Sequence, residues 1–381
     1  MNNDEIIGNL IRARDFSQID AFVETVRSDP EAIAHFTRHG TKPEVAVAWA
    51  NQHGYDFDLP ALEAWIERST AALAAARQER HAGWLARRAD SAGVEPQDVA
   101  RDTRAVLHDL AWSTGFELDR KAVLSGDVVV IRQCTPILGL RDLITGHLGA
   151  MFETDNLAQV FETRDDVTMQ RCSAAAYRGF LEDKHVPEIM HAVHVALGCL
   201  PEESLWEWPG FRLIPALPRE LGIYRDHHTG SVGSHRDTWY GSPHHQINCW
   251  TPLWPMARGA GVVVQTHWYQ HPVDNTSAGY DQWLNALGLT LPPVPRIETA
   301  GPGELSPHVE PGDLLIFAGQ HLHRSGCNSG PGARGSLEWR LLVEPDRRQP
   351  WCPVNVDFRG RGEIAENWFD HNGTPAMPAA T

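Results

Sequence analysis

The sequence predicts an α+β protein in which a β-rich core follows a smaller helical domain. The amino-terminal residues place apolar side chains at helical spacing, whereas from about residue 120 onward short β-rich runs alternate with Gly/Pro turns. The length of 381 residues also exceeds what one ordinary domain needs. We therefore divide the chain into an all-helical domain, residues 1–95, and a second domain, residues 96–381.

Three segments support the helical domain. Between Ile19 and Phe36, apolar residues recur at spacings close to three and four, which predicts a helix. Glu44–Asn51 is a second, shorter helical run, and Gly54 is a suitable stop for it. Residues 59–90 are rich in Ala, Arg, Glu and Leu, which predicts a long helix that could bridge to the second domain.

The second domain contains many short strands with helices ahead of them. Val128–Ile131 is typical of a buried strand, and Ile137–Phe152 and Val186–Leu200 are expected to be helices that flank it. Further strands are expected at Phe211–Ile214, Ile247–Leu253, Gly261–Gln265, Leu314–Phe317 and Leu337–Val343. This pattern favours a β-barrel or β-sandwich with helical support.

Composition excludes several classes of protein. A net charge of −16 argues against nucleic-acid binding, which requires a basic surface. The sequence has neither a signal-peptide pattern nor an apolar stretch long enough to cross a membrane, so no membrane partner is expected. Six scattered cysteines without a C-x-x-C pair fit neither a zinc site nor a disulfide framework. We expect a cytoplasmic, reduced protein.

The strongest chemical signal begins with His235-Arg236-Asp237. In an extended segment, residues two apart point to the same side, so His235 and Asp237 could offer an imidazole and a carboxylate to one metal ion. The alternative is a hydrogen-bonded His/Asp pair in a loop, and this tripeptide alone does not decide between the two.

A second segment raises the weight of the metal interpretation. Glu310–Asp313 predicts a tight turn and Leu314–Phe317 a buried strand, after which the chain presents His321 and His323. Either histidine could complete a site of two histidines and one carboxylate. Such a site occupies one face of an octahedron and suits Fe(II) that must bind a bidentate cosubstrate together with dioxygen.

These residues carry a family resemblance. His235-x-Asp237, the strand GDLLIF, the phrase from His323 to Asn328 (H-x-S-G-x-N) and an arginine eleven positions after His323, Arg334, resemble the phytanoyl-CoA dioxygenase family. The resemblance covers about residues 125–345. It implies a double-stranded β-helix (jelly-roll or cupin-like) fold and an Fe(II)- and 2-oxoglutarate-dependent dioxygenase that hydroxylates a C–H bond with O2.

The resemblance also assigns residues. It makes His323 the distal metal ligand and Arg334 the clamp for the distal carboxylate of 2-oxoglutarate, since a guanidinium can donate two parallel hydrogen bonds. Ser325 and Asn248 are further candidates for contact with the cosubstrate. His321 remains the rival ligand. Arg340 remains the rival clamp, or a strand residue that pairs with Glu338 or Glu344.

Aromatic and imidazole side chains follow the H-x-D motif. Trp239, Tyr240 and His244 are candidates for the lining of a substrate pocket, although a stripe of aromatic residues is nearly as often core. The substrate itself is expected to be a small molecule or a peptide.

The helical domain has a resemblance of its own. Phe22–Trp65, and above all the phrase A-x-x-x-G-Y-x-F-x-x-x-x-L from Ala50 to Leu62, resembles the nitrogen-fixation-type (Nif-eleven) leader domain found in precursors of peptide natural products. The resemblance implies natural-product biosynthesis and a peptide or protein partner for this domain. The alternative is a helical cap on the main domain.

Two other functions stay open on the sequence alone. One is a non-enzymatic β-barrel that recognises a peptide partner, and the other is an iron oxygenase that uses no 2-oxoglutarate and therefore needs no Arg334 clamp. Iron binding with turnover of 2-oxoglutarate separates the dioxygenase from the non-enzymatic β-barrel.

Overall fold

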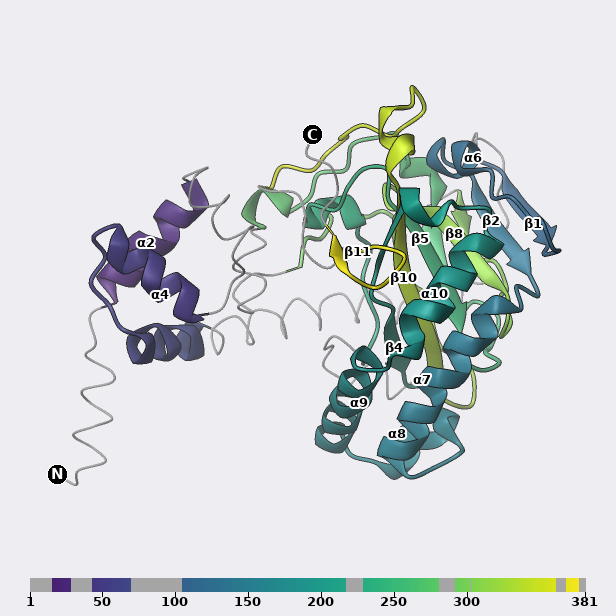
Figure 1. Ribbon diagram of the computed structural model, residues 1–381, viewed down its shortest axis with the longest axis horizontal. Coiled ribbons are helices and arrows are strands. Elements are labelled where there is room, and N and C mark those ends of the chain that lie inside the picture. The colour runs from purple at the N-terminus through teal and green to yellow at the C-terminus, as the bar shows by residue number, and fades with distance from the viewer. Residues whose placement is uncertain are drawn as a thin grey trace.

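The computed structural model describes residues 16–28, 43–69, 105–216, 229–280, 292–301, 303–360 and 368–376. The described elements before residue 70 are all helical, and those after residue 104 combine helices with two sheets (Figure 1). The α+β class is therefore the one that the sequence predicts.

The helices before residue 70 have a hydrophobic core of their own. They are α2 (Ser17–Ser28), α4 (Pro43–Gln52) and the helical residues 59–69, drawn in purple and dark blue in Figure 1. Phe22, Trp49 and Leu62, one from each helix, are buried in a single cluster. The predicted stop at Gly54 is present, with φ +87°. Residues 29–36 and 70–90 of the predicted helices lie outside the described residues.

The remaining elements follow in chain order. The helices are α6 (Arg120–Leu124), α7 (Pro136–Phe152), α8 (Val160–Thr163), α9 (Asp166–Leu181) and α10 (His185–Ala196). The strands are β1 (Leu107–Ala111), β2 (Val128–Arg132), β3 (Ser204–Glu207), β4 (Gly210–Ile214), β5 (Ile247–Pro252), β6 (Val262–Gln265), β7 (Glu304–Leu305), β8 (Leu314–Ala318), β9 (Leu322–Ser325), β10 (Arg334–Val343), β11 (Trp368–Phe369) and β12 (Pro375–Ala376).

The large sheet has the order β1-β2-β8-β5-β10-β3-β11-β12, with β4 also paired to β10. All of its pairings are antiparallel except that between β1 and β2. The register sets Arg340 on β10 opposite Asn248 on β5, and Asn248 opposite Phe317 on β8. Because side chains alternate along a strand, these three residues share one face of the sheet.

The small sheet, β7-β6-β9, lies against that face. Residues 232–235 extend it, since His235 and His323 exchange backbone hydrogen bonds of 3.0 and 2.9 Å in an isolated bridge. Apolar side chains from both sheets, including Val130, Val264 and Phe317, form one buried cluster between them. The two sheets therefore pack face to face, as expected for a sandwich.

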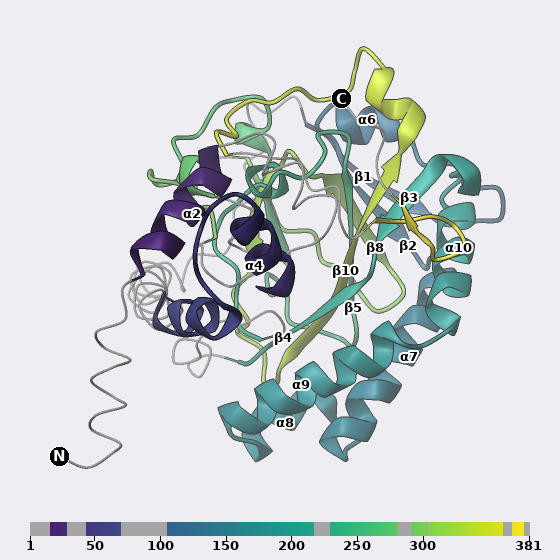
Figure 2. The ribbon, with the colours of Figure 1, turned by 60° about the vertical axis from the view of Figure 1, so that its left-hand side comes forward.

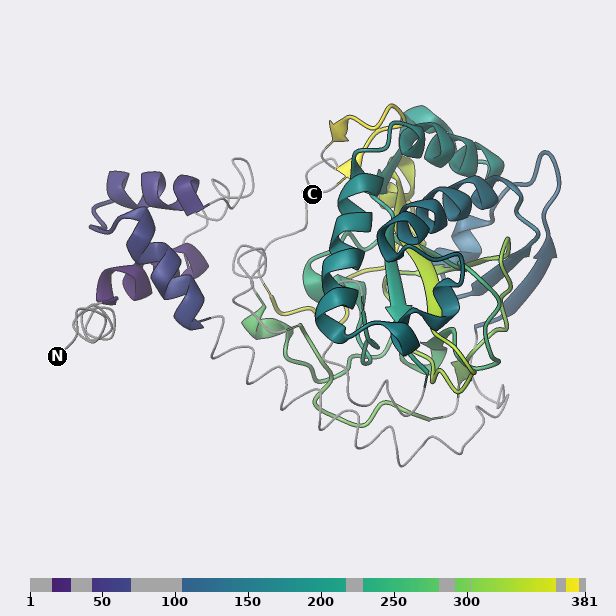
Figure 3. The ribbon, with the colours of Figure 1, turned by 90° about the horizontal axis from the view of Figure 1, so that it is seen from below.

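A layer of helices covers the other face of the large sheet. Helix α7 packs against α9 and α10, and in Figures 1–3 these helices run side by side in teal next to the strands. The largest hydrophobic cluster lies here and includes Ile144 of α7, Cys249 of β5 and Trp339 of β10. Among the described residues, no helix is both long and apolar enough to cross a lipid bilayer.

Candidate metal centre

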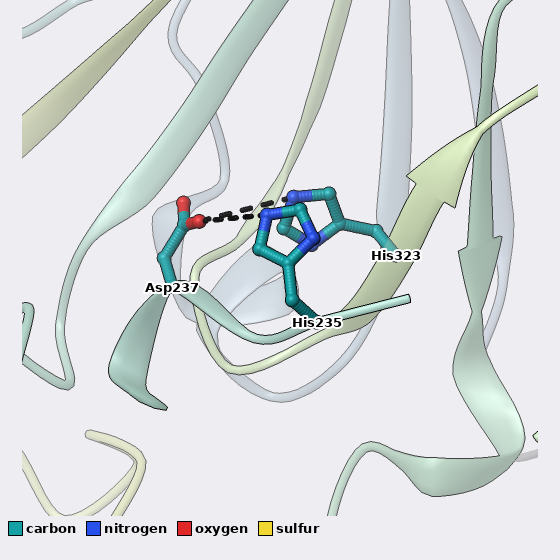
Figure 4. A group of neighbouring side chains, drawn as sticks. All are labelled: His235, Asp237 and His323. Atoms are coloured by element: carbon teal, nitrogen blue, oxygen red, sulfur yellow. Dashed lines mark ion pairs between the residues drawn. The ribbon is translucent and has the colours of Figure 1, made fainter. Parts of the chain in front are cut away.

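Three predicted ligands converge at the edge of the small sheet. The Nε2 atoms of His235 and His323 lie 3.5 and 3.9 Å from Oδ1 of Asp237, and the ligand atoms of all three residues fall within 4.8 Å of one another. Figure 4 shows both rings turned toward the same carboxylate oxygen. Asp237 is 2% exposed, so its carboxylate is buried. One metal ion could take all three atoms.

The hydrogen bonds of the two rings leave both Nε2 atoms as acceptors. Nδ1 of His235 lies 2.8 Å from the carbonyl oxygen of Gly233, and Nδ1 of His323 lies 3.0 Å from that of His321. A carbonyl oxygen only accepts, so each Nδ1 must carry the proton and donate it. The lone pair of each ring is then on Nε2, which is the arrangement that metal-binding histidines use.

The carboxylate of Asp237 is held by its other oxygen. Oδ2 accepts a hydrogen bond of 2.9 Å from Nε2 of Gln246 and one of 3.4 Å from Nε of Arg340. Burial alone would raise the pKa of Asp237, but Arg340 and the two histidines outweigh it and hold that pKa well below its usual value. Asp237 is therefore an anion with one oxygen directed at the histidines.

Arg236, the residue between His235 and Asp237, holds these two residues in place through its own buried side chain. Its fully buried guanidinium donates to the carbonyl oxygens of Trp268, Tyr269, His271 and Gln320, at 2.5–3.1 Å. Its Nε lies 3.2 Å from a carboxylate oxygen of Asp357. Nothing in the sequence pattern assigned a role to Arg236, because all of these partners are more than 30 positions away.

The rival ligand His321 faces another part of the protein. Its Nε2 lies 2.9 Å from the carbonyl oxygen of Gly126, its ring packs on Tyr269, and the residue is 0% exposed. Burial lowers the pKa of His321 to about 4 and that of His323 to about 4, so both are neutral near pH 7. Only His323 joins the group with His235 and Asp237.

The two candidate arginines lie on the same face of β10 with different partners. Arg334 is 2% exposed, donates to the carbonyl oxygens of Ala260 (2.7 Å) and Gly261 (3.0 Å), and lies over the ring of Trp250. Arg340 instead contacts Asp237 and pairs with Glu207 at 2.6 Å. The ion-pair partner of Arg340 thus comes from the neighbouring strand β3, and Glu338, one of the two partners considered from the sequence, adds an electrostatic interaction.

Ser325 and Asn248 are both buried, and each already holds a hydrogen bond. Oγ of Ser325 accepts a hydrogen bond of 2.9 Å from the backbone N–H of Val232, and this bond helps to attach residues 232–235 to β9. Oδ1 of Asn248 accepts 2.7 Å from Gln246, the residue that also holds Asp237. Asn248 therefore reaches the metal group through Gln246.

The three candidates for a pocket lining are separated by the structure. Trp239 is 0% exposed, donates a hydrogen bond of 2.7 Å to Asp357 and packs with Val273. It is therefore a core residue, the alternative that the sequence left open. The half-buried ring of Tyr240 meets His235 edge-on at 5.7 Å between centroids. His244 is half-buried ahead of β5, where burial lowers its pKa.

No family model matches the chain, and no curated protein matches it. Solved structures do. EvdO2 from Micromonospora carbonacea var. aurantiaca, complexed with 2-oxoglutarate, is 14% identical with a TM-score of 0.31, over 44% of this chain and 63% of its own. The alignment therefore spans less than two thirds of EvdO2.

Two further structures align over more of the chain. The Ni complex of the non-heme monooxygenase ThoJ is 12% identical with a TM-score of 0.36, over 69% of this chain and 90% of its own. The epimerase SnoN, in complex with Fe3+, alpha ketoglutarate and nogalamycin RO, is 12% identical with a TM-score of 0.36, over 68% and 94%. At TM-scores this low, none of these three structures assigns a role to a residue of this chain.

Proposed function

We propose that this protein is an Fe(II)- and 2-oxoglutarate-dependent dioxygenase that hydroxylates an unactivated C–H bond. One observation carries the proposal: two imidazole Nε2 atoms and one carboxylate oxygen converge, while the remaining polar atom of each of these three groups is held by another residue. Two histidines and a carboxylate with three positions left open form the ligand set of non-haem Fe(II) oxygenases.

The donor set fits this metal. Neutral imidazoles and one carboxylate suit Fe(II), and none of the six free cysteines joins the group. When bound, Fe(II) and 2-oxoglutarate supply the redox chemistry: one oxygen atom of O2 enters the C–H bond as hydroxyl, and the other enters the succinate that is formed with CO2. The chain needs no nucleophile of its own, and its residues bind, orient and exclude water.

For the cosubstrate we propose Arg334 as the carboxylate clamp. Arg334 stands at the position that the family resemblance assigns to the clamp, and its guanidinium is oriented by hydrogen bonds to the carbonyl oxygens of Ala260 and Gly261. Arg340 is a poorer clamp, since Glu207 and Asp237 already balance its charge. Ser325 on β9 and Asn248 on β5 are the proposed polar contacts for the rest of the cosubstrate.

We further propose a double-stranded β-helix for the two-sheet core and a division into residues 1–95 and 96–381. The proposed substrate is a small molecule or peptide in natural-product biosynthesis, with Tyr240 and His244 among its contacts and a cytoplasmic location. The separate helical cluster of Phe22, Trp49 and Leu62 supports a module that could recruit a peptide partner.

Anaerobic titration tests the metal and the cosubstrate together. Fe(II) followed by 2-oxoglutarate should produce a visible charge-transfer band, and exposure to air should release succinate even without a substrate. A band that appears with Fe(II) alone and does not respond to 2-oxoglutarate would favour an iron oxygenase of another kind. No iron binding at all would favour a non-enzymatic binding protein.

A shortened chain tests the proposed division. Because the three ligands all lie beyond residue 230, a chain that begins at Asp102 should fold and still form the charge-transfer band. Turnover of the natural substrate is expected to fall if the helical module recruits it. A shortened chain that has native circular dichroism but lacks the band would contradict the division.

A further inference from the structure

We propose that Arg340, held by Glu207, is a positioning residue that keeps Asp237 bound to its metal through one oxygen only. The inference rests on the metal centre of the proposed function and adds to it the origin of the open coordination positions. It concerns residues that the sequence pattern did not connect.

A chain of contacts crosses three elements. Arg340 lies on β10 with its side chain on the face that the small sheet covers. Its Nε lies 3.4 Å from Oδ2 of Asp237. Its Nη1 donates a hydrogen bond of 2.6 Å to Oε2 of Glu207, the last residue of β3. Because a guanidinium is planar and rigid, these two contacts fix the direction from which Asp237 is approached.

Gln246 completes the hold on the same oxygen. Its Nε2 donates a hydrogen bond of 2.9 Å to Oδ2 of Asp237 and a second one of 2.7 Å to Oδ1 of Asn248. Oδ2 therefore faces two donors, whereas Oδ1 faces His235 and His323 at 3.5 and 3.9 Å. The two oxygens of one carboxylate have separate tasks, and turning Oδ2 toward a metal would break both hydrogen bonds.

The hydrogen bonds to Oδ2 of Asp237 affect how many coordination positions of the metal stay open. In an octahedral site, two histidines and one carboxylate oxygen leave three positions, enough for a bidentate cosubstrate and one more ligand. A carboxylate that binds through both oxygens takes one of those three. By occupying Oδ2, Arg340 and Gln246 keep that position open.

Charge and geometry make opposite predictions for Arg340. As a cation near the site it repels a metal ion, so loss of its charge would tighten metal binding. As the residue that orients Asp237 it strengthens metal binding, because loss of a residue that hydrogen-bonds to a metal ligand typically costs about 10–100-fold in metal affinity. The ion pair with Glu207 largely neutralises Arg340, so we expect the geometric effect to exceed the charge effect.

The test uses Co(II) and Mn(II) alone, titrated into the full chain by calorimetry, with the visible spectrum of Co(II) as a second readout. Arg340→Ala should raise the metal Kd by about 10–100-fold and change the Co(II) spectrum toward another coordination number. Arg340→Lys, which keeps the charge and one donor, should recover part of the affinity. Glu207→Ala should give a smaller loss in the same direction.

A double variant and a matched control sharpen the outcome. If Glu207 acts through Arg340, the variant with both changed to Ala binds metal no more weakly than Arg340→Ala alone. Arg132→Ala is the matched control, since Arg132 on β2 also pairs with two carboxylates, Asp109 and Asp313, and neither belongs to the metal group. Its metal Kd and Co(II) spectrum should match those of the parent chain.

Two results would overturn the inference: unchanged or tighter metal binding by Arg340→Ala, or an equal loss in the Arg132→Ala control. If Arg340→Ala fails to fold, Glu207→Ala and Arg340→Lys decide by the same readouts. Neither readout needs iron, cosubstrate or substrate, so a negative oxygenase assay leaves the inference standing. A parent chain that binds neither Co(II) nor Mn(II) would instead contradict the metal centre itself.

Discussion

The two faces of strand β10 differ in what they contribute. On one face Leu337, Trp339 and Leu341 are 0–1% exposed and pack into the cluster beneath the helices. On the other face Arg334 and Arg340 extend toward the small sheet and the metal group. Because neighbouring side chains of a strand alternate in direction, one ten-residue element serves both the core and the site.

The comparison teaches that stability and chemistry are separable here. Apolar packing depends on volume and burial, so the helical side of β10 should tolerate other side chains of similar size. The opposite side depends on hydrogen bonds directed at single atoms, such as that of Gln246 to Oδ2 of Asp237. Substitutions on the first face should therefore change unfolding, and those on the second should change binding.

The largest effect is expected at the ligands. His235→Ala, Asp237→Ala and His323→Ala should each abolish iron-dependent turnover, because two remaining ligands hold Fe(II) poorly against water. Circular dichroism and the melting temperature should stay close to those of the parent, and His321→Ala serves as the comparison. Activity retained by His323→Ala but lost with His321→Ala would move the distal ligand to His321.

On the face of β10 that packs under the helices, Trp339→Ala should lower the stability of the protein and leave metal binding unchanged. Removing this 1%-exposed side chain leaves a cavity and should lower the free energy of unfolding by about 3–5 kcal/mol. The metal Kd of the folded protein should be unchanged. Urea unfolding and Co(II) titration of the same sample measure both quantities, and a large change in metal affinity would show that the two faces are coupled.

The next prediction separates the two arginines of the inner face. Arg334→Ala should remove a buried charged hydrogen-bond donor from the cosubstrate carboxylate, which costs about 2–5 kcal/mol of binding free energy. The KM for 2-oxoglutarate should therefore rise roughly 30-fold or more. At saturating metal, Arg340→Ala should raise that KM less than Arg334→Ala does, because Gln246 still holds Oδ2 of Asp237 and the own contacts of Arg340 are Asp237 and Glu207. Succinate release at varied 2-oxoglutarate is the measurement. Equal, mild effects would remove Arg334 from the clamp.

The smallest effect concerns pH and the helical layer. His194 of α10 is 2% exposed, and burial lowers its pKa to about 3. Its folded pKa lies below the unfolded value near 6.5, so the stability linked to His194 is complete above pH 6.5 and is lost as pH falls toward 3. That loss amounts to about 1.4 kcal/mol per pH unit.

His194→Leu should remove this part of the acid sensitivity. Urea unfolding at pH 7, 6 and 5 should show a shallower decline for His194→Leu than for the parent chain. His185→Leu, an exposed position on the same helix, should decline as the parent does. Identical slopes for all three proteins would mean that His194 is not the group responsible.

Most elements of the β-rich part could be predicted because their signals are local. The apolar run at Leu314–Phe317 and the helical spacing in Ile137–Phe152 correspond to β8 and α7 within one or two residues. Strand β1 escaped prediction since it is an edge strand with an almost wholly exposed pattern and no alternation. Helix α9 escaped as well, because Ala and polar residues dilute its apolar stripe.

For the site, the sequence by itself determined the residue types and their spacing. His235-x-Asp237 and His323 are readable as a ligand set, since a two-residue spacing in extended chain fixes a common direction. Only the tertiary structure decided which histidine joins them, because His323 lies on β9, His321 directly precedes that strand, and their ring nitrogens meet different distant partners.

The supporting contacts were likewise decided by the tertiary structure. Arg236 reaches carbonyl groups beyond residue 265, and Arg340 reaches Glu207 across 133 positions of chain. Such contacts depend on which strands become neighbours and in what register, and a one-residue slip of β10 would turn Arg340 to the helical face. The sequence determines the candidate ligands through their local spacing, and the packing of the two sheets determines how these side chains are held.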